Sequence, residues 1–205
     1  MLLFISYGPK RPRKSSFTPP LADSSVRAIK LPSVGTAGVA GASTGSNFIN
    51  AVISESAFDS ISEYIDFAKK DKNAEIIAGG NYDKTKGYFI EPTVIEGLDN
   101  NSRLNQEEIF GPVVTLQSFK SEEEAIEIAN DTNVSFQASI FSNNIDETMS
   151  FYKKINASAV FHNDHTAFRV DWMPFAGLKH SGHGVGGIKY TMHEMQIEKM
   201  MVLRN

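Results

Sequence analysis

The chain has 205 residues, of which 41% are hydrophobic and 21% are charged, a composition typical of a globular protein with one large domain or one and a half. Its formal net charge of −4 argues against nucleic acid as the main partner, and it has no apolar run long enough to span a bilayer. It contains no cysteine, which excludes disulfides, thiolate metal sites and a cysteine nucleophile.

Residues 1–46 differ in composition from the rest of the chain. Four basic residues lie within Lys10–Lys14 beside several prolines, and a stretch rich in Gly, Ala, Ser and Thr runs from Gly35 to Ser46. We therefore expect a disordered or unrelated leader over 1–46 and a folded domain over 47–205. A basic, acid-poor leader also resembles an organelle transit peptide. We expect a cytoplasmic protein, with the mitochondrial matrix as the alternative.

From residue 47 onward, apolar periodicity predicts strands that alternate with helices of about three turns. A helix is expected over Ser56–Lys70, with Ser54 or Ser56 as its N-cap, and Ser121–Glu124 forms a capping box that opens another. A third helix is expected from Asn144. Strands are expected at Glu75–Ala78, Tyr88–Ile90, Thr93–Ile95, Val113–Phe119, Ala138–Phe141 and Ala159–Phe161.

This alternation predicts an α/β fold with a mostly parallel sheet and flanking helices. The apolar end of the chain, Glu198–Arg204, predicts a terminal strand that pairs with the sheet of another subunit. Residues 164–188 are Gly-rich, aromatic and irregular, which is typical of a loop that carries a functional site.

A candidate binding edge lies in the stretch Glu107–Val113, where an acidic pair, an aromatic residue and a Gly-Pro break run into a β-branched strand. Ligands of α/β proteins bind at strand ends. The Glu108 carboxylate could accept hydrogen bonds from a sugar diol, and the Phe110 ring could cover a flat heterocycle. The alternative is that Glu108 is a solvated charge at a helix end and Phe110 is part of the core.

Four of the five histidines form two pairs at a spacing of three, His162 with His165 and His180 with His183. With Asp164 nearby, a zinc or nickel site is conceivable. Because the pairs fall on loops and strand ends, we favour solvated or hydrogen-bonded histidines and expect no metal.

Residues 47–205 resemble the C-terminal half of the aldehyde dehydrogenase superfamily. The pieces that carry the resemblance are Gly79-Gly80, Gly87 to Val94, Glu107 to Val113, Asn163, and Pro174 to Gly182. The front part, up to Lys84, is most similar to glutamate-semialdehyde (1-pyrroline-5-carboxylate) dehydrogenases. The back part, including Phe168–Pro174 and Gly184–Ile188, is more similar to other NAD(P)-dependent members.

The resemblance implies that Glu108 holds the nicotinamide ribose hydroxyls of NAD or NADP and that Phe110 packs beside the nicotinamide. It implies that Phe175, Ser181 and Gly182 line the aldehyde pocket and that Asn163 supports the site at a strand end. The implied activity is NAD(P)-dependent oxidation of a small aldehyde to a carboxylate. The implied partners are a second copy, as a homo-oligomer, or a full-length subunit, without nucleic acid or membrane.

Three departures from the family pattern affect activity. The family reacts through a cysteine thiolate, which this sequence does not contain, and a Rossmann-type half would lie before residue 47, where the leader is expected. The usual Pro-Phe-Gly-Gly is Pro-Phe-Ala-Gly here, and Ala176 would be harmful if its φ were positive. We therefore expect a family fragment that is inactive alone. The alternative is a non-catalytic partner of full-length subunits.

Overall fold

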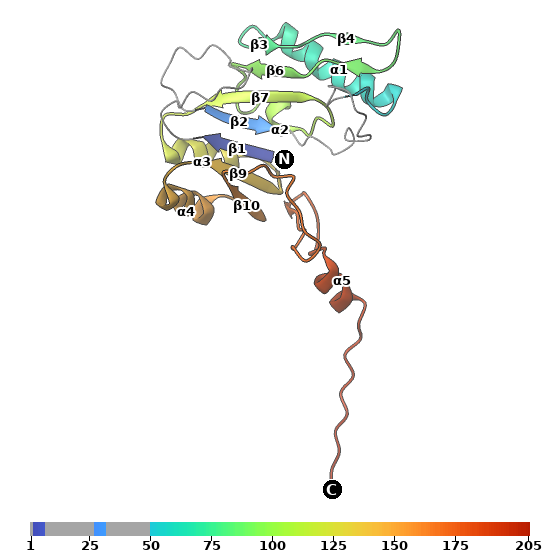
Figure 1. Cartoon of the computed structure of the whole chain (residues 1–205). Coiled ribbons are helices and arrows are strands. Elements are labelled where there is room, and N and C mark those ends of the chain that lie inside the picture. Colours follow the sequence, from blue (N-terminus) through green and yellow to red (C-terminus); the bar gives the residue numbers. More distant parts are fainter. Residues whose placement is uncertain (1, 7–26, 32–49) are drawn as a thin grey trace.

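The computed structural model describes residues 2–6, 27–31 and 50–205. Its main feature is a seven-stranded sheet in the order β10-β9-β1-β2-β7-β6-β3 (Figure 1). The strands are β1 (Leu2–Ser6), β2 (Arg27–Leu31), β3 (Glu75–Ala78), β6 (Thr93–Glu96), β7 (Val113–Ser118), β9 (Gln137–Phe141) and β10 (Ala159–His162). The six strands expected between Glu75 and Phe161 are therefore confirmed to within a residue or two, one of them outside this sheet. The strand expected at Glu198–Arg204 is not formed in the described structure, and its pairing with another subunit stays a prediction.

The sheet is mixed, with parallel strands in the majority. β10 pairs in parallel with β9, β9 with β1, and β6 with β7, whereas β2 is antiparallel to both β1 and β7, and β3 is antiparallel to β6. Five strands consequently share one direction, and only β2 and β3 oppose it. The predicted α/β class is confirmed.

The segment expected as a leader contributes two strands to the centre of the sheet. β1 lies between β9 and β2, with Leu2 opposite Gln137 and Leu31, and β2 lies between β1 and β7. The expectation of a disordered or unrelated leader is therefore wrong for Leu2–Ser6 and Arg27–Leu31. The remainder of that expectation concerns residues outside the described ranges.

Helix α1 (Glu55–Lys70) shows how the sequence specifies its local structure. Its apolar residues recur at helical spacing and are buried, and the Ser54 hydroxyl accepts a hydrogen bond from the Ala57 N–H at 3.2 Å. The helix α3 (Glu122–Asn130) begins with the predicted capping box. Glu124 N–H donates to Ser121 Oγ at 3.2 Å, and Lys120 N–H donates to the Glu124 carboxylate at 2.7 Å.

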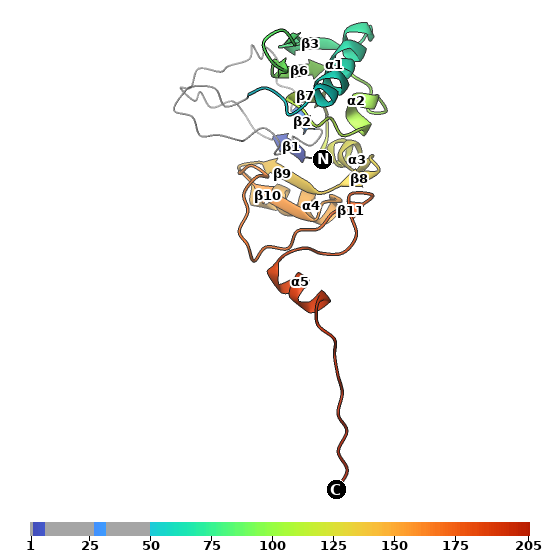
Figure 2. The same cartoon turned by 90° about the vertical axis from the view of Figure 1, so that its right-hand side faces the viewer.

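Among the described residues, two hydrophobic clusters form the core. One packs α1 and the short helix α2 (Arg103–Gln106) against β6 and β7, and the other packs α3 and α4 (Ile145–Lys154) against β9. Figure 2 shows α1, α2 and α3 on the same side of the sheet. Fully buried side chains along β6 and β7 alternate with half-buried ones, so these strands turn one face towards the helices.

The smaller elements lie outside the main sheet. β4 (Tyr82–Asp83) pairs with β5 (Phe89–Ile90), and β8 (Val134–Ser135) pairs with β11 (Leu178–Lys179). The helix α5 (Ile188–Glu194) and the segment after it project away from the body of the molecule (Figures 1 and 2). Residues 196–205 are exposed and form no strand with any described residue. In the described part of the chain, no helix is long and apolar enough to cross a membrane.

Candidate functional site

The stretch between α2 and β7 presents Glu108 and Phe110 to the surface. Ile109, between them, is buried in the cluster beneath α1, while Glu108 is exposed and Phe110 is 62% exposed. Ile109 thus faces the core, while the residues on either side of it face outward. Phe110 is therefore not a core residue, and its ring is available to pack against a ligand.

Glu107 anchors the same stretch to α1. Its Oε2 accepts hydrogen bonds from the Tyr64 hydroxyl at 2.6 Å and from Arg103 Nε at 2.6 Å. Arg103 also pairs with Glu63 at 2.8 Å, and its guanidinium lies 4.4 Å from the centre of the Tyr64 ring. The hydrogen bond from Tyr64, supported by Arg103, lowers the pKa of Glu107. Burial, followed by the Glu107 carboxylate, raises the pKa of Tyr64.

Close packing at Gly111 fixes the other end of the stretch. A Cβ at this position would lie 2.6 Å from Ile61 Cδ1, so any larger residue would push the stretch away from α1. Two short-range backbone bonds, Gly111 N–H to Ile109 O at 2.7 Å and Val113 N–H to Gly111 O at 2.8 Å, form the tight turn into β7. Glu107, Ile109 and Gly111 together hold Glu108 and Phe110 in place.

The loop that carries Phe175, Ser181 and Gly182 packs on the beginning of β9. The Phe175 ring meets the Phe136 ring edge-on, with centroids 4.7 Å apart, and Ser181 Oγ accepts the Ser135 N–H at 2.8 Å. Phe175 is 46% exposed, and Ser181 and Gly182 are also exposed. The structure therefore brings the three predicted pocket residues to one surface, next to the residues that precede β9.

The loop is tightened at Gly177 and tethered by Lys179. A Cβ on Gly177 would lie 2.4 Å from the Ser181 carbonyl oxygen, so this close approach requires glycine. Lys179 has a φ of 54°, and its Nζ donates to the carbonyls of Asn130 at 2.6 Å and Thr132 at 2.7 Å. Ala176 does not have a positive φ, so the expected harm from alanine at this position does not arise.

Two groups of predicted site residues lie at the same edge of the sheet. They are the cofactor wall, formed by Glu108 and Phe110, and the aldehyde wall, formed by Phe175, Ser181 and Gly182. β7 and β9 run in the same direction, and the registers through β1 and β2 align Ser139 with Leu116, hence Phe136 with Val113. Phe110 and Phe175 are thus both next to the edge at which the parallel strands begin. Three strand spacings separate β7 from β9, or about 14 Å. Both groups of predicted site residues therefore lie at strand ends, at the edge where β7 and β9 begin.

Asn163 lies at the opposite edge, at the end of β10. Its side chain accepts the Ser142 N–H at 3.0 Å and donates to the Ser142 carbonyl at 2.8 Å, and its φ is 54°. From there the chain crosses the face of β9 that α3 and α4 leave free, where Ser139 Oγ donates to the Asp164 carbonyl. Asn163 therefore fixes the start of the loop without lining either wall.

The histidine pairs do not form a metal cluster. His162 is bonded to Thr148 Oγ1 at 2.9 Å and to Asn163 Nδ2 at 2.9 Å, and His165 approaches Asp164 at 3.8 Å. His180 and His183 are exposed. Within residues 2–6, 27–31 and 50–205, no three His, Asp or Glu side chains are placed to hold an ion together.

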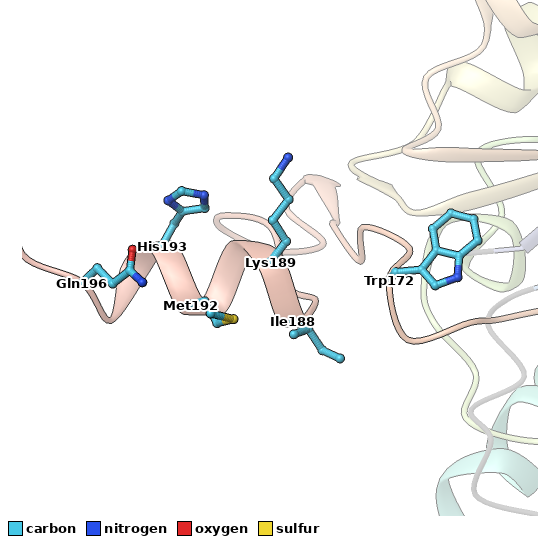
Figure 3. Close-up of a pocket in the computed structure, with 6 residues that line it drawn as sticks. All are labelled: Trp172, Ile188, Lys189, Met192, His193 and Gln196. Carbon is cyan, nitrogen blue, oxygen red and sulfur yellow. The ribbon is translucent and has the colours of Figure 1, made fainter.

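A groove of about 370 Å³ lies next to the loop, between Trp172 and α5. Ile188 and Lys189 are on its wall and extend to opposite sides of the helix, and Trp172 lies on the loop across from them (Figure 3). None of the five predicted cofactor or pocket residues lines this groove. Trp172 is 78% exposed, so its fluorescence is sensitive to changes in the surroundings of the loop.

Comparison with known proteins identifies the family of the chain. The model of the aldehyde dehydrogenase family matches residues 27–201, a span that includes β2. The chain belongs to the aldehyde dehydrogenase family.

Individual relatives agree with this assignment. The chain is 37% identical over 156 residues to a sulfoacetaldehyde dehydrogenase from Neptuniibacter caesariensis, covering 76% of this chain and 33% of that protein. It is 39% identical over 143 residues to a 1-pyrroline-5-carboxylate dehydrogenase from Staphylococcus haemolyticus, covering 69% and 27%. The chain thus spans about a third of the length of these relatives.

Solved structures show the same fold. Aldehyde dehydrogenase 21 from Physcomitrella patens, in complex with the reaction product succinate, gives a TM-score of 0.71 at 36% identity over 78% of this chain and 32% of that one. Betaine aldehyde dehydrogenase from Staphylococcus aureus, in complex with NAD+, gives 0.69 at 33% identity over 78% and 32%.

Two groups of residues in the site were not singled out by sequence reasoning. Tyr64 and Arg103 hold Glu107 from 43 and 4 positions away, and nothing in their local sequence marks the longer contact. Arg169 lies over the Phe175 ring at 4.4 Å. In the sequence, the segment Phe168–Pro174 carries only the family resemblance, and the charge of Arg169 within it is the signal that could have found it.

Proposed function

We propose that this chain supplies the nicotinamide-facing and aldehyde-facing walls of an NAD(P)-dependent aldehyde dehydrogenase site. The observation that carries the proposal is that both predicted walls lie along one edge of the sheet in a chain of this family. A relative of known structure that holds NAD+ supports the choice of cofactor.

The residues of the first wall fit the cofactor. Glu108 forms no hydrogen bond within residues 2–6, 27–31 and 50–205, so its carboxylate can accept from both hydroxyls of a ribose. The exposed ring of Phe110 offers a flat apolar face to a nicotinamide. When bound, NAD(P) supplies the hydride acceptor for aldehyde oxidation. Phe175, Ser181 and Gly182 form the opposing wall and position the aldehyde.

We also propose that these 205 residues do not oxidise aldehydes by themselves. Oxidation in this family begins with attack by a cysteine thiolate, and the sequence contains no cysteine. The purified chain, mixed with NAD+ or NADP+ and glutamate semialdehyde or a short aldehyde, should give no reduced cofactor. The Staphylococcus haemolyticus relative is the positive control. Protein-dependent formation of reduced cofactor would overturn this part of the proposal.

A chimera tests the first wall within a complete enzyme. Residues 93–118 of this chain would replace the matching segment of the Staphylococcus haemolyticus relative. We expect the chimera to retain activity and Glu108→Gln to raise its KM for NAD+ by about tenfold, since a carboxylate that binds ribose is lost. Ser118→Ala, an exposed position in the same segment, is the matched control. An unchanged KM in Glu108→Gln would contradict the assignment of Glu108.

The second candidate function is that of a non-catalytic partner of complete dehydrogenase subunits. The exposed apolar segment after α5 favours it, because Ile197 is 95% exposed and Met200 is 86% exposed. In this role the segment would pair with the sheet of another subunit, whether a second copy of this chain or a full-length relative.

A further inference from the structure

Arg169 lies in the loop that carries Phe175 and the other residues of the predicted aldehyde pocket. Its guanidinium carbon lies 4.4 Å from the centre of the Phe175 ring. Phe175 is itself fixed from two sides. Its ring packs edge-on against Phe136, and its backbone exchanges two hydrogen bonds with Gly186 at 3.0 and 2.7 Å. The arginine is therefore held by a fixed ring within a loop.

The hydrogen-bond donors of Arg169 have no partner among the described residues. The guanidinium carbon lies over the Phe175 ring, and the five N–H donors of a guanidinium lie in its plane. Across residues 2–6, 27–31 and 50–205, Arg169 donates no hydrogen bond, and the loop carboxylates Asp164 and Asp171 lie outside ion-pair distance of it. The side chain is exposed, so an anion can reach these donors.

Arg103 provides an internal comparison. It lies over the Tyr64 ring at the same 4.4 Å, but its donors are taken by Glu63 at 2.8 Å and Glu107 at 2.6 Å. The described structure therefore places an arginine guanidinium over an aromatic ring twice. Arg103 has carboxylate partners, and Arg169 has none among the described residues. The unfilled arrangement lies on the aldehyde wall.

We propose that Arg169 determines substrate specificity by binding the oxoanion group, carboxylate or sulfonate, of an anionic aldehyde against Phe175. This inference rests on the proposed function and names the substrate class for that site. The guanidinium fork matches two oxygens of a carboxylate or sulfonate, and the two parallel hydrogen bonds orient the other end of the substrate. Aldehydes that carry a quaternary ammonium group would be repelled by the same charge.

The test uses binding, which requires neither a nucleophile nor a nicotinamide cofactor. Trp172 is the only tryptophan of the chain and lies three residues from Arg169, so its fluorescence reports on the loop. The purified chain is titrated with succinate, sulfoacetate and choline, and isothermal calorimetry repeats each titration. We expect saturable binding of succinate and sulfoacetate and none of choline.

Variants of Arg169 identify the binding group. Arg169→Met should weaken binding of both anions by about tenfold or more, and Arg169→Lys should be intermediate because it keeps the charge and loses the planar fork. Lys189→Met removes another exposed cation from the groove beside Trp172 and should leave binding unchanged.

Each remaining result counts against the inference. Anion binding that is equal in the unmodified chain and Arg169→Met would overturn it, and so would the absence of binding in both fluorescence and calorimetry. The proposed function fails separately. Succinate binding that depends on Arg169 would support this inference even if the chimera lost activity, whereas an active chimera with binding independent of Arg169 would overturn this inference alone.

Discussion

At the scale of residues, the hydrogen bond between Tyr64 and Glu107 connects α1 to the stretch that presents Glu108 and Phe110. Tyr64→Phe removes the donor while retaining the ring beneath Arg103. We expect the free energy of unfolding at pH 7 to fall by about 1 kcal/mol, as for a hydrogen bond to a partly exposed carboxylate. Urea denaturation measures the change. Tyr152→Phe is the control, because Tyr152 is 57% exposed, and it should change stability by less than about 0.5 kcal/mol.

The pH dependence of this difference follows from the pKa shifts. Glu107 has a lowered pKa in the folded state, so its contribution is complete above the unfolded value of 4.5 and is lost as the pH falls through the folded value. Tyr64 has a raised pKa, so its contribution is complete below the unfolded value of 10.0 and is lost as the pH rises through the folded value. The difference between the unmodified chain and Tyr64→Phe should therefore shrink at both extremes. A constant difference from pH 3 to pH 7 would contradict the assignment.

The sequence allowed part of the site to be predicted at this scale. Glu108 and Phe110 could be proposed as candidates because an acidic pair and an aromatic residue precede a Gly-Pro break and a β-branched strand. Tyr64 and Arg169 were not, because each acts through a contact with a ring or carboxylate that the fold brings together. Local patterns describe a residue's own segment, whereas such contacts depend on the packing of distant segments.

At the scale of elements, α1 and α3 could be predicted from capping residues and apolar spacing, and the structure confirms both N-caps. β1 and β2 could not. A strand of five residues carries little periodic signal, and the surrounding prolines and basic residues indicated a leader. Their places in the sheet depend on backbone pairing with β9 and β7, which lie far away in the sequence.

The pairing of β1 leads to a test by strand complementation. A chain that begins at Gly8 would leave the facing edges of β9 and β2 without β1. We expect lower stability, measured by urea denaturation, and recovery on addition of a peptide spanning residues 1–7. The same peptide with Phe4→Pro should fail, because proline cannot donate to the ladder of an interior strand. Equal recovery with both peptides would show that pairing of β1 is not responsible.

At the scale of the whole molecule, the exposed apolar segment after α5 should drive association. Met200 and Val202 are 86% and 75% exposed. We expect light scattering to show oligomers of the chain, and the double variant Met200→Lys with Val202→Lys should shift them to monomers by placing charges in the pairing segment. Ser118→Lys, at an exposed position of the main sheet, is the control. If light scattering showed the unmodified chain to be a monodisperse monomer, that result would contradict the proposed partner function.

The central position of β1 also affects how the chain folds during synthesis. Leu2 pairs with Gln137, about 135 residues later, so β1 leaves the ribosome well before β9. Until β9 leaves the ribosome, β1 has no parallel neighbour, and β2 alone cannot complete the sheet. Long-range strand pairing of this kind slows folding and prolongs the exposure of unpaired backbone. Yield from cells should therefore depend on the rate of translation and on chaperones that bind β1 while it is unpaired.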